Sequence, residues 1–190
     1  MRKPWNLLII VVLVSLSTSA QLQQTAKEEK EKAQVDHQHD FDWEIGDWEV
    51  HLRRLLHPLT GSKTWVNLEG TAHVRKVWNS RANLLELELH GKTGNIEGLS
   101  LRLFNPRSQQ WSVYFTTSDR GTLGTPMAGR FDNGRGEFSG RELYQGKMID
   151  LQFKFSEVTA KSFHGEQSFS PDGGKSWETN WIEDFTRADR

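Results

Sequence analysis

From Asp47 onward, apolar and polar residues alternate with a period of two, and no window sustains the 3.6-residue period of a helix. Clusters of Gly, Asn, Asp and Pro interrupt this alternation about every ten residues. The pattern is typical of strands that have one buried face and one exposed face. We therefore predict an all-β domain.

The alternation and the turn residues together predict about ten strands. They cover residues 48–56, 64–78 with a bend at Gly70, 84–90, 99–104, 111–117, 127–131, 137–144, 148–155, 162–169 and 177–185. Turn residues such as Asp132-Asn133-Gly134 and Asp172-Gly173-Gly174 keep the links short. Short links predict that strands consecutive in sequence are antiparallel neighbours.

Ten such strands can form a two-layer sandwich or a closed meander, and closure removes both exposed edges. We therefore favour a roughly ten-stranded, antiparallel, up-and-down β-barrel. The predicted inner face consists of Leu85, Leu87, Leu89, Leu99, Leu101, Leu103, Trp111, Val113, Phe115, Ile149, Leu151, Phe153 and Phe155. The predicted outer face carries Glu86, Glu88, Arg102, Ser112, Asp150, Gln152 and Lys154.

The first 20 residues have the features of a secretory signal peptide. Arg2 and Lys3 provide the positive start, residues 7–16 the apolar stretch, and Thr18-Ser19-Ala20 the small-residue cleavage site. The apolar stretch is about half of the roughly 20 residues that a membrane anchor needs. We expect a secreted or periplasmic protein with no stable membrane insertion after cleavage.

Residues 21–40 are rich in Glu, Lys and Gln, and we expect a disordered, charged linker ahead of a barrel domain at 41–190. The end of the linker gathers Asp36, His37, His39, Asp40 and Asp42, which are residue types that bind transition metals. A flexible segment does not orient such ligands, so we predict no metal site there.

The composition excludes several partners and chemistries. The formal net charge is -1, and without Arg2 and Lys3 there are 22 basic residues against 25 acidic ones, so nucleic acid is not an expected partner. The chain has no Cys, so no disulfide stabilises it. It also lacks a Gly-x-Ser-x-Gly elbow, a phosphate loop and a dinucleotide fingerprint. No cofactor is indicated.

Gly46 and Trp48 form a Gly-x-Trp sequence at the start of the first predicted strand, and Arg187 follows the last strand. In this the chain resembles the lipocalin and calycin barrels. The resemblance implies that Trp48 closes one end of the barrel and that Arg187 packs across it, with a gain of about 0.5–2 kcal/mol for a guanidinium over an indole face.

A longer set of motifs between Phe41 and Arg187 is similar to the DUF1579 family of exported proteins, and this similarity implies a calycin-like barrel without a particular activity. The motifs are Gly46-x-Trp48, Trp78 with Asn83-Leu84-Leu85-Glu86, Gly98-Leu99-Ser100-Leu101-Arg102-Leu103-Phe104, Gly129-x-Phe131, Gly134-x-Gly136-x-Phe138, and the segment from Gln167 to Trp181. Within the last segment, residues 170–177 also match the Asp-box of sialidase propellers. From this match we predict a hairpin in which Asp172 accepts turn amides and Trp177 packs underneath.

A barrel of about ten strands leaves more interior volume than one of eight, which side chains can fill. We therefore expect a binding protein for a small, largely apolar molecule. The candidate ligand-binding residues are polar or aromatic positions among aromatic neighbours: Asn83, Glu86, Glu166, Gln167, Asn180, Trp181 and Glu183. A single bulge would reverse which face of a strand points inward, so the faces of these strands stay open.

Three alternatives stay open. A haem could use His164, which is the only histidine in a strongly aromatic stretch. An enzyme could use Glu86 or Glu166 as a buried general acid or base, although no motif calls for it. An interaction module of the cell envelope would display exposed aromatic side chains such as Trp65 or Trp78.

Overall fold

The computed structural model describes residues 21, 24–25 and 36–188. The chain divides into two units, Met1–Asp36 and His37–Arg190, and the second contains all the strands. The predicted signal peptide and most of the predicted linker lie outside the described residues. Within the described ranges, no helix is long and apolar enough to cross a membrane.

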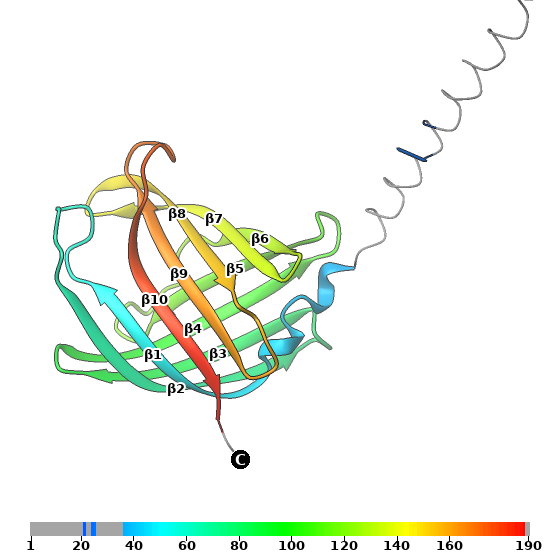
Figure 1. Ribbon diagram of the computed structural model, residues 1–190, viewed down its shortest axis with the longest axis horizontal. Helices are drawn as coiled ribbons and strands as arrows, with labels where there is room; N and C mark the ends of the chain where they lie inside the picture. Colours follow the sequence, from blue (N-terminus) through cyan, green and yellow to red (C-terminus); the bar gives the residue numbers. More distant parts are fainter. Residues whose placement is uncertain (1–20, 22–23, 26–35, 189–190) are drawn as a thin grey trace, which may run out of the picture. The chain divides into compact units, whose positions relative to one another are not determined.

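The second unit is a closed antiparallel barrel of ten strands in sequence order, which confirms the predicted fold class (Figure 1). Its strands are β1 (Gly46–Leu55), β2 (Trp65–Val77), β3 (Ala82–Gly91), β4 (Gly94–Asn105), β5 (Gln110–Thr117), β6 (Met127–Asp132), β7 (Arg135–Tyr144), β8 (Lys147–Ser156), β9 (Ser162–Ser170) and β10 (Glu178–Arg187). Pairing of β1 with β10, from Trp48↔Arg187 to Arg54↔Trp181, closes the ring.

The strands begin and end within a few residues of the predicted bounds, except that β4 starts five residues early. Gly91 pairs with Gly94 across a turn of only two residues, so the predicted long turn between Gly91 and Gly98 is wrong. Gly94 has φ +126°, a conformation that favours glycine. The added residues place Ile96 in the core opposite Leu89.

Two glycines allow neighbouring strands to approach closely. A Cβ atom on Gly70 would lie 1.8 Å from the main-chain oxygen of Glu88, and one on Gly129 would lie 1.9 Å from that of Glu137. Any side chain at either position would collide with the backbone. Gly70 therefore occupies the predicted bend in β2 because only glycine fits there.

A short N-terminal segment, with 3-10 helices η1 (His37–His39) and η2 (Asp42–Glu44), lies against one end of the barrel, which we call the capped end (Figure 1). The Nε1 of Trp111 donates to the main-chain oxygen of His37 at 2.7 Å, and Asp40 accepts from the amide of Phe131 at 3.0 Å. Residues 37–40 are therefore part of the folded unit and not of a disordered linker, because these bonds tie them to β5 and β6.

The inner face of β4 is the opposite of the one predicted. Leu99, Leu101 and Leu103 are half-buried on the outer side, whereas Ser100 and Arg102 are buried and point inward. The three leucines form the more apolar stripe, but Arg102 can lie inside because Glu44 pairs with it there. The inward stripes predicted on β3, β5 and β8 are as observed, since alternate residues on those strands pack toward the core.

Candidate functional site

The two ends of the barrel differ in packing. At the capped end, Phe41, Trp48, Trp111 and Phe138 are fully buried, and their rings belong to one cluster with other phenylalanines. The other end carries the turns after β1, β3, β5, β7 and β9, and we call it the open end. Near the open end Leu55, Leu89 and Ile149 are buried, whereas the inward-facing Phe115 and Trp181 are partly exposed.

Arg187 locks the capped end. Its guanidinium carbon lies 3.7 Å from the ring centroid of Trp48, and its terminal nitrogens donate to the main-chain oxygens of Ile45 and Trp43 at 2.8 and 2.7 Å. This is the contact that the resemblance to calycin barrels implies. The Nε1 of Trp48 in turn donates to the main-chain oxygen of Glu44 at 2.6 Å.

At the open end, Phe115 on β5 meets Trp181 on β10. Their ring centroids are 6.0 Å apart in an edge-on arrangement, although the two strands lie on opposite sides of the ring of ten. Phe115 is 37% exposed and Trp181 is half-buried. The two rings therefore span the interior at the open end, and we refer to them as the aromatic pair.

Glu183 lies two residues along β10 from Trp181 and is only 9% exposed. Its Oε2 accepts a hydrogen bond from the Nε1 of Trp181 at 2.7 Å. Its Oε1 lies beside Gly165 and the ring of Phe153, since a Cβ on Gly165 would sit 2.8 Å from Oε1 and 2.9 Å from the Phe153 Cζ. In the part of the chain that the structure describes, no cation forms an ion pair with Glu183.

Burial raises the pKa of Glu183 to about 7. The hydrogen bond from Trp181 opposes this rise, the carboxyl of Glu44 adds to it, and Arg102 and His164 act against it. Burial is the largest of these effects because the charged form loses its hydration. Glu183 can therefore gain or lose a proton near neutral pH.

A second polar group lies on the interior side of β3 and β4. Arg102 holds Glu44 with two hydrogen bonds, one of them 3.0 Å from its Nη2 to the Glu44 Oε1, and its guanidinium carbon lies 4.6 Å from the Phe41 ring centroid. Burial raises the pKa of Glu44, and Arg102 opposes that rise. The Nε of Arg102 and the Oδ1 of Asn83, on the paired position of β3, are buried without hydrogen-bond partners among the described residues.

Charged and phenolic side chains surround the open end. Burial raises the pKa of Glu142, against the influence of Arg120, and raises that of Tyr144, with Glu142 and Glu178 adding to the rise. The Oε1 of Glu178 accepts from the amide of Leu59 at 2.6 Å and so ties the loop after β1 to β10. The rim is therefore polar while the wall below it is aromatic.

Five of the seven residues predicted for ligand binding lie in the interior or at its bulge. Asn83, Trp181 and Glu183 face the interior, and Gln167 donates to the Oδ1 of Asn180 at 2.9 Å. A β-bulge between Thr179 and Trp181 shifts the register of β10 against β9. This shift places the side chain of Asn180 beside that of Gln167.

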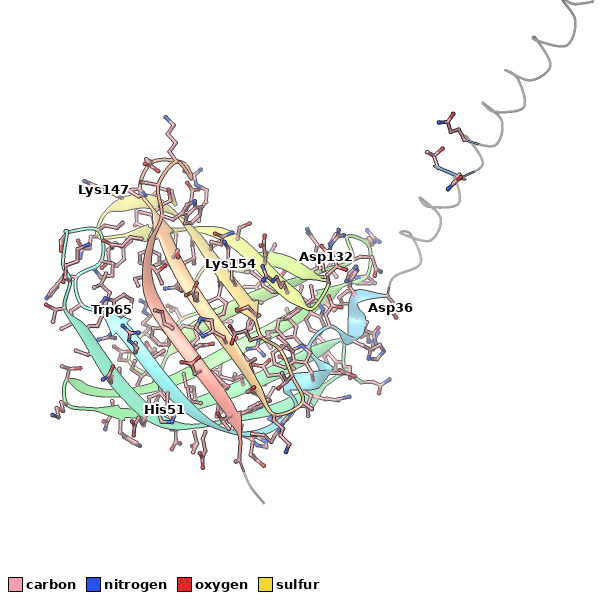
Figure 2. All side chains as sticks on the ribbon, in the orientation of Figure 1. Asp36, His51, Trp65, Asp132, Lys147 and Lys154 are labelled. Carbon is pink, nitrogen blue, oxygen red and sulfur yellow. The ribbon has the colours of Figure 1, made fainter. Side chains whose placement is uncertain are left out.

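Glu86 and Glu166 are on the outer side of the barrel. Glu86 is exposed on β3, and Glu166 lies 3.4 Å from His164 on β9. His164 also pairs with Asp184 at 2.7 Å, and these partners raise its pKa although burial acts in the opposite direction. The haem interpretation of His164 is therefore wrong, because its ring points away from the interior. His51 lies on the same outer wall, on β1 (Figure 2).

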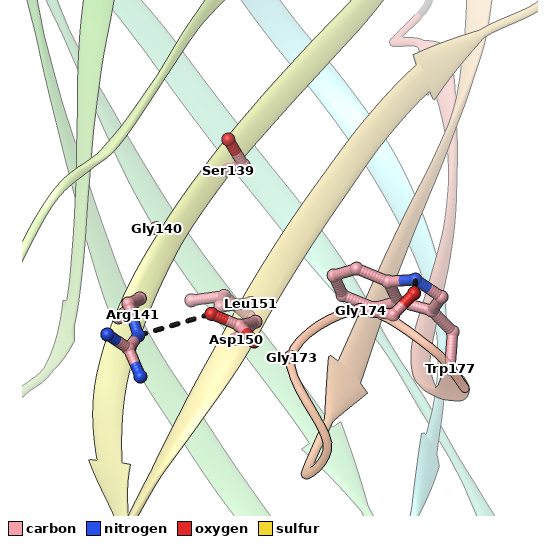
Figure 3. Close-up of a pocket in the computed structure, with 8 residues that line it drawn as sticks. All are labelled: Ser139, Gly140, Arg141, Asp150, Leu151, Gly173, Gly174 and Trp177. Atoms are coloured by element: carbon pink, nitrogen blue, oxygen red, sulfur yellow. Dashed lines mark hydrogen bonds and ion pairs between the residues drawn. The ribbon is translucent and has the colours of Figure 1, made fainter.

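A shallow depression of about 580 Å³ lies on the outer wall, between β7, β8 and the loop of residues 171–177 (Figure 3). Arg141 and Asp150 line it and pair with each other at 3.2 Å, so their charges already have partners.

In the hairpin of residues 171–177, Asp172 accepts hydrogen bonds from the amides of Lys175 and Ser176. Its hydrogen bonds, chiefly that from the Ser176 hydroxyl, lower its pKa to about 2. Trp177 is 43% exposed and lies against this hairpin, since its Nε1 donates to the Gly174 oxygen at 3.2 Å and a Cβ on Gly174 would lie 3.7 Å from its ring.

Other expected sites have simpler arrangements. His37 pairs with Asp40 and His39 with Asp42, and among residues 36–188 no group of three or more such side chains could hold a metal ion. Trp78, in the turn after β2, is 66% exposed.

Comparison with known proteins identifies the fold. The sequence matches no protein-family model and no curated protein sequence. The S-type phycobiliprotein lyase CPES from Guillardia theta is similar in structure, with a TM-score of 0.57 and 10% identity over 85% of this chain and 98% of that one. EF1p2_mFAP2b bound to DFHBI has a TM-score of 0.44 with 10% identity over 80% and 99% of the two chains, and a redesigned β-barrel has 0.43 with 11% identity over 80% and 96%. The first similarity places this chain among ten-stranded barrels.

Proposed function

We propose that this protein is an exported binding protein that takes a small, largely apolar ligand into the open end of its barrel. The observation that carries the proposal is the contrast between the two ends. Phe41, Trp48, Trp111 and Phe138 at the capped end are fully buried, whereas the inward-facing Phe115 and Trp181 near the open end are partly exposed. Apolar walls with a few fixed polar groups are typical of small-molecule sites.

The outer depression supports binding less well than the interior does. Its charged side chains are paired with each other. In the interior, toward the capped end, the Asn83 Oδ1 and the Arg102 Nε are by contrast buried without hydrogen-bond partners among the described residues. Polar atoms of this kind cost about 1–3 kcal/mol each when buried, and a ligand that pairs with them recovers part of that cost.

The test is calorimetric titration of the purified protein with 2-naphthylmethanol, a neutral aromatic probe, followed by fatty acids, isoprenoids and tetrapyrroles. We expect saturable binding that Trp181→Ala weakens by about tenfold or more, because loss of one large aromatic contact removes about 1.5–3 kcal/mol. Trp177→Phe, on the outer wall, is the matched control and leaves the affinity unchanged. Absence of saturable binding by every compound, or equal affinity in Trp181→Ala, would refute the proposal.

Export and family membership are further parts of the proposal. Residues 1–20 have the sequence of a signal peptide, and cleavage gives a mature N-terminus at Gln21, which sequencing of the protein recovered outside the cytoplasm tests. We also propose membership of the DUF1579 family, on the motifs given above. Recovery of the intact N-terminus would contradict the signal-peptide assignment.

One observation favours a second candidate, an enzyme with acid or base chemistry in the interior. A carboxyl with a pKa of about 7 in a largely apolar site is suited to proton transfer near neutral pH, and Glu183 is such a group. Glu86 and Glu166 are not candidates, because they lie on the outer side. Loss of turnover in Glu183→Gln with unchanged substrate affinity would support this candidate, and unchanged turnover would exclude Glu183 from it.

A further inference from the structure

Glu183 is the most deeply buried carboxyl whose charge has no ion-pair partner within residues 36–188. The still more deeply buried Glu44 is held by two hydrogen bonds from Arg102. Arg102 is already paired with Glu44, so an ionised Glu183 has no opposite charge in direct contact with it among the described residues. An isolated buried charge is costly, and pairing with an opposite charge offsets that cost.

The surroundings of Glu183 suit a positive group that is attached to an apolar body. Its carboxyl and the edge of the Phe153 ring occupy the space that a side chain at position 165 would take, so the Oε1 has the apolar edge of Phe153 close to it. The aromatic pair of Phe115 and Trp181 lies at the open end of the same interior. Aromatic faces attract cations, by about 0.5–2 kcal/mol, whereas they offer nothing to a carboxylate.

We propose that the ligand is an organic cation, an apolar or aromatic molecule with a protonated nitrogen that pairs with the Glu183 carboxylate. This inference rests on the proposed binding function and specifies its ligand class. The charged groups that act on Glu183 are Glu44 from η2, Arg102 from β4 and His164 from β9. Arg102 is occupied by Glu44, and the ring of His164 lies on the outer side with Asp184, so neither neutralises Glu183 by direct contact.

The experiment compares three probes of one shape in calorimetric titrations of the purified protein at about pH 8, where Glu183 is mostly ionised. The probes are 2-naphthylmethylamine as the cation, 2-naphthylmethanol as the neutral analogue and 2-naphthoate as the anion. We expect the amine to bind about 10- to 100-fold more tightly than the alcohol, because a charge-assisted hydrogen bond contributes about that much affinity. The anion binds most weakly.

Glu183→Gln keeps an acceptor for the Trp181 Nε1 and removes only the charge. We expect it to abolish the preference for the amine, and urea denaturation followed by circular dichroism shows that the variant is folded. Glu86→Gln, an exposed carboxyl on the outer side of β3, is the matched control and keeps the wild-type preference.

The outcomes separate the two proposals. Equal affinities for amine and alcohol, a preference for the anion, or a preference for the amine that survives Glu183→Gln would each overturn the cation assignment while interior binding stands. If none of the three probes binds, the cation assignment falls, and the binding function falls with it unless the fatty acids, isoprenoids or tetrapyrroles bind. Weaker amine binding as the pH falls from about 8 to 5.5, with constant alcohol binding, would further support the pairing with Glu183.

Discussion

Replacement of Glu183 by glutamine should stabilise the protein at alkaline pH and leave its stability nearly unchanged at acidic pH. The pKa of Glu183 in the folded protein is about 7, against an ordinary value of 4.5. A raised carboxyl pKa means that the folded state binds the proton more tightly than the unfolded state does. The contribution of Glu183 to stability therefore decreases as the pH rises from about 4.5 to about 7.

The size of the effect follows from the pKa difference. A pKa raised from 4.5 to about 7 corresponds to about 3 kcal/mol of stability lost above the folded-state pKa. This is a large share of the roughly 5–15 kcal/mol that stabilises an ordinary domain. Glutamine carries no charge at any pH and accepts the same hydrogen bond from Trp181, so the variant avoids the loss.

The assay is urea denaturation followed by circular dichroism, at intervals from about pH 4.5 to pH 8.5, for wild type and Glu183→Gln. The raised pKa of His164 also makes stability decrease as the pH rises. This effect is present in wild type and in Glu183→Gln, so the difference in stability between the two proteins reports Glu183. Glu49→Gln, an exposed carboxyl on β1, serves as the control and should show no pH-dependent difference. A flat difference across this range, or a variant less stable than wild type at pH 8, would refute the reasoning.

Three further predictions concern the scaffold, each measured as a free energy of unfolding in urea. Arg187→Ala should lose about 2 kcal/mol or more, because two hydrogen bonds to the capping segment and one ring contact disappear, and Arg187→Lys should recover part of it. Gly129→Ala should cost about 3 kcal/mol or prevent folding, whereas Gly124→Ala, with open space around its Cβ, should stay within about 0.5 kcal/mol of wild type. Glu44→Gln should cost about 3–5 kcal/mol, and combining it with Arg102→Met should cost less than the two single changes added together, since the pair is buried.

The sequence predicted the strands and the closure of the barrel because both follow from local patterns. Period-two alternation and short turns are visible without knowledge of distant contacts. The predicted inner face of β4 was wrong because it depends on a contact that is distant in sequence. Leu99, Leu101 and Leu103 make the more apolar stripe, yet Arg102 faces inward, because its partner Glu44 lies 58 residues away in the sequence and in a separate segment.

The sequence predicted only part of the site. The residues that it missed make their contacts only when the barrel closes. Trp181 and Glu183 stand out in sequence as polar and aromatic neighbours on one strand. Phe115 was placed on the inner face but not in the site, because its contact with Trp181 forms only when strands on opposite sides of the barrel face one another. Gly165 gave no signal of its own, since its role is to make room for the Glu183 carboxyl itself.

The unpaired state of Glu183 is itself the strongest argument that the interior has a purpose beyond packing. Glutamine would satisfy the Trp181 Nε1 equally well and would avoid the cost of a buried charge above pH 7. A buried side chain that costs stability and lacks the kind of partner that Arg102 provides to Glu44 is typical of a functional position. The same carboxyl that lowers the stability of the protein above pH 7 would provide the charge that a cationic ligand needs, so the preference for a cation and the Glu183 contribution to the pH dependence of stability should both disappear in Glu183→Gln.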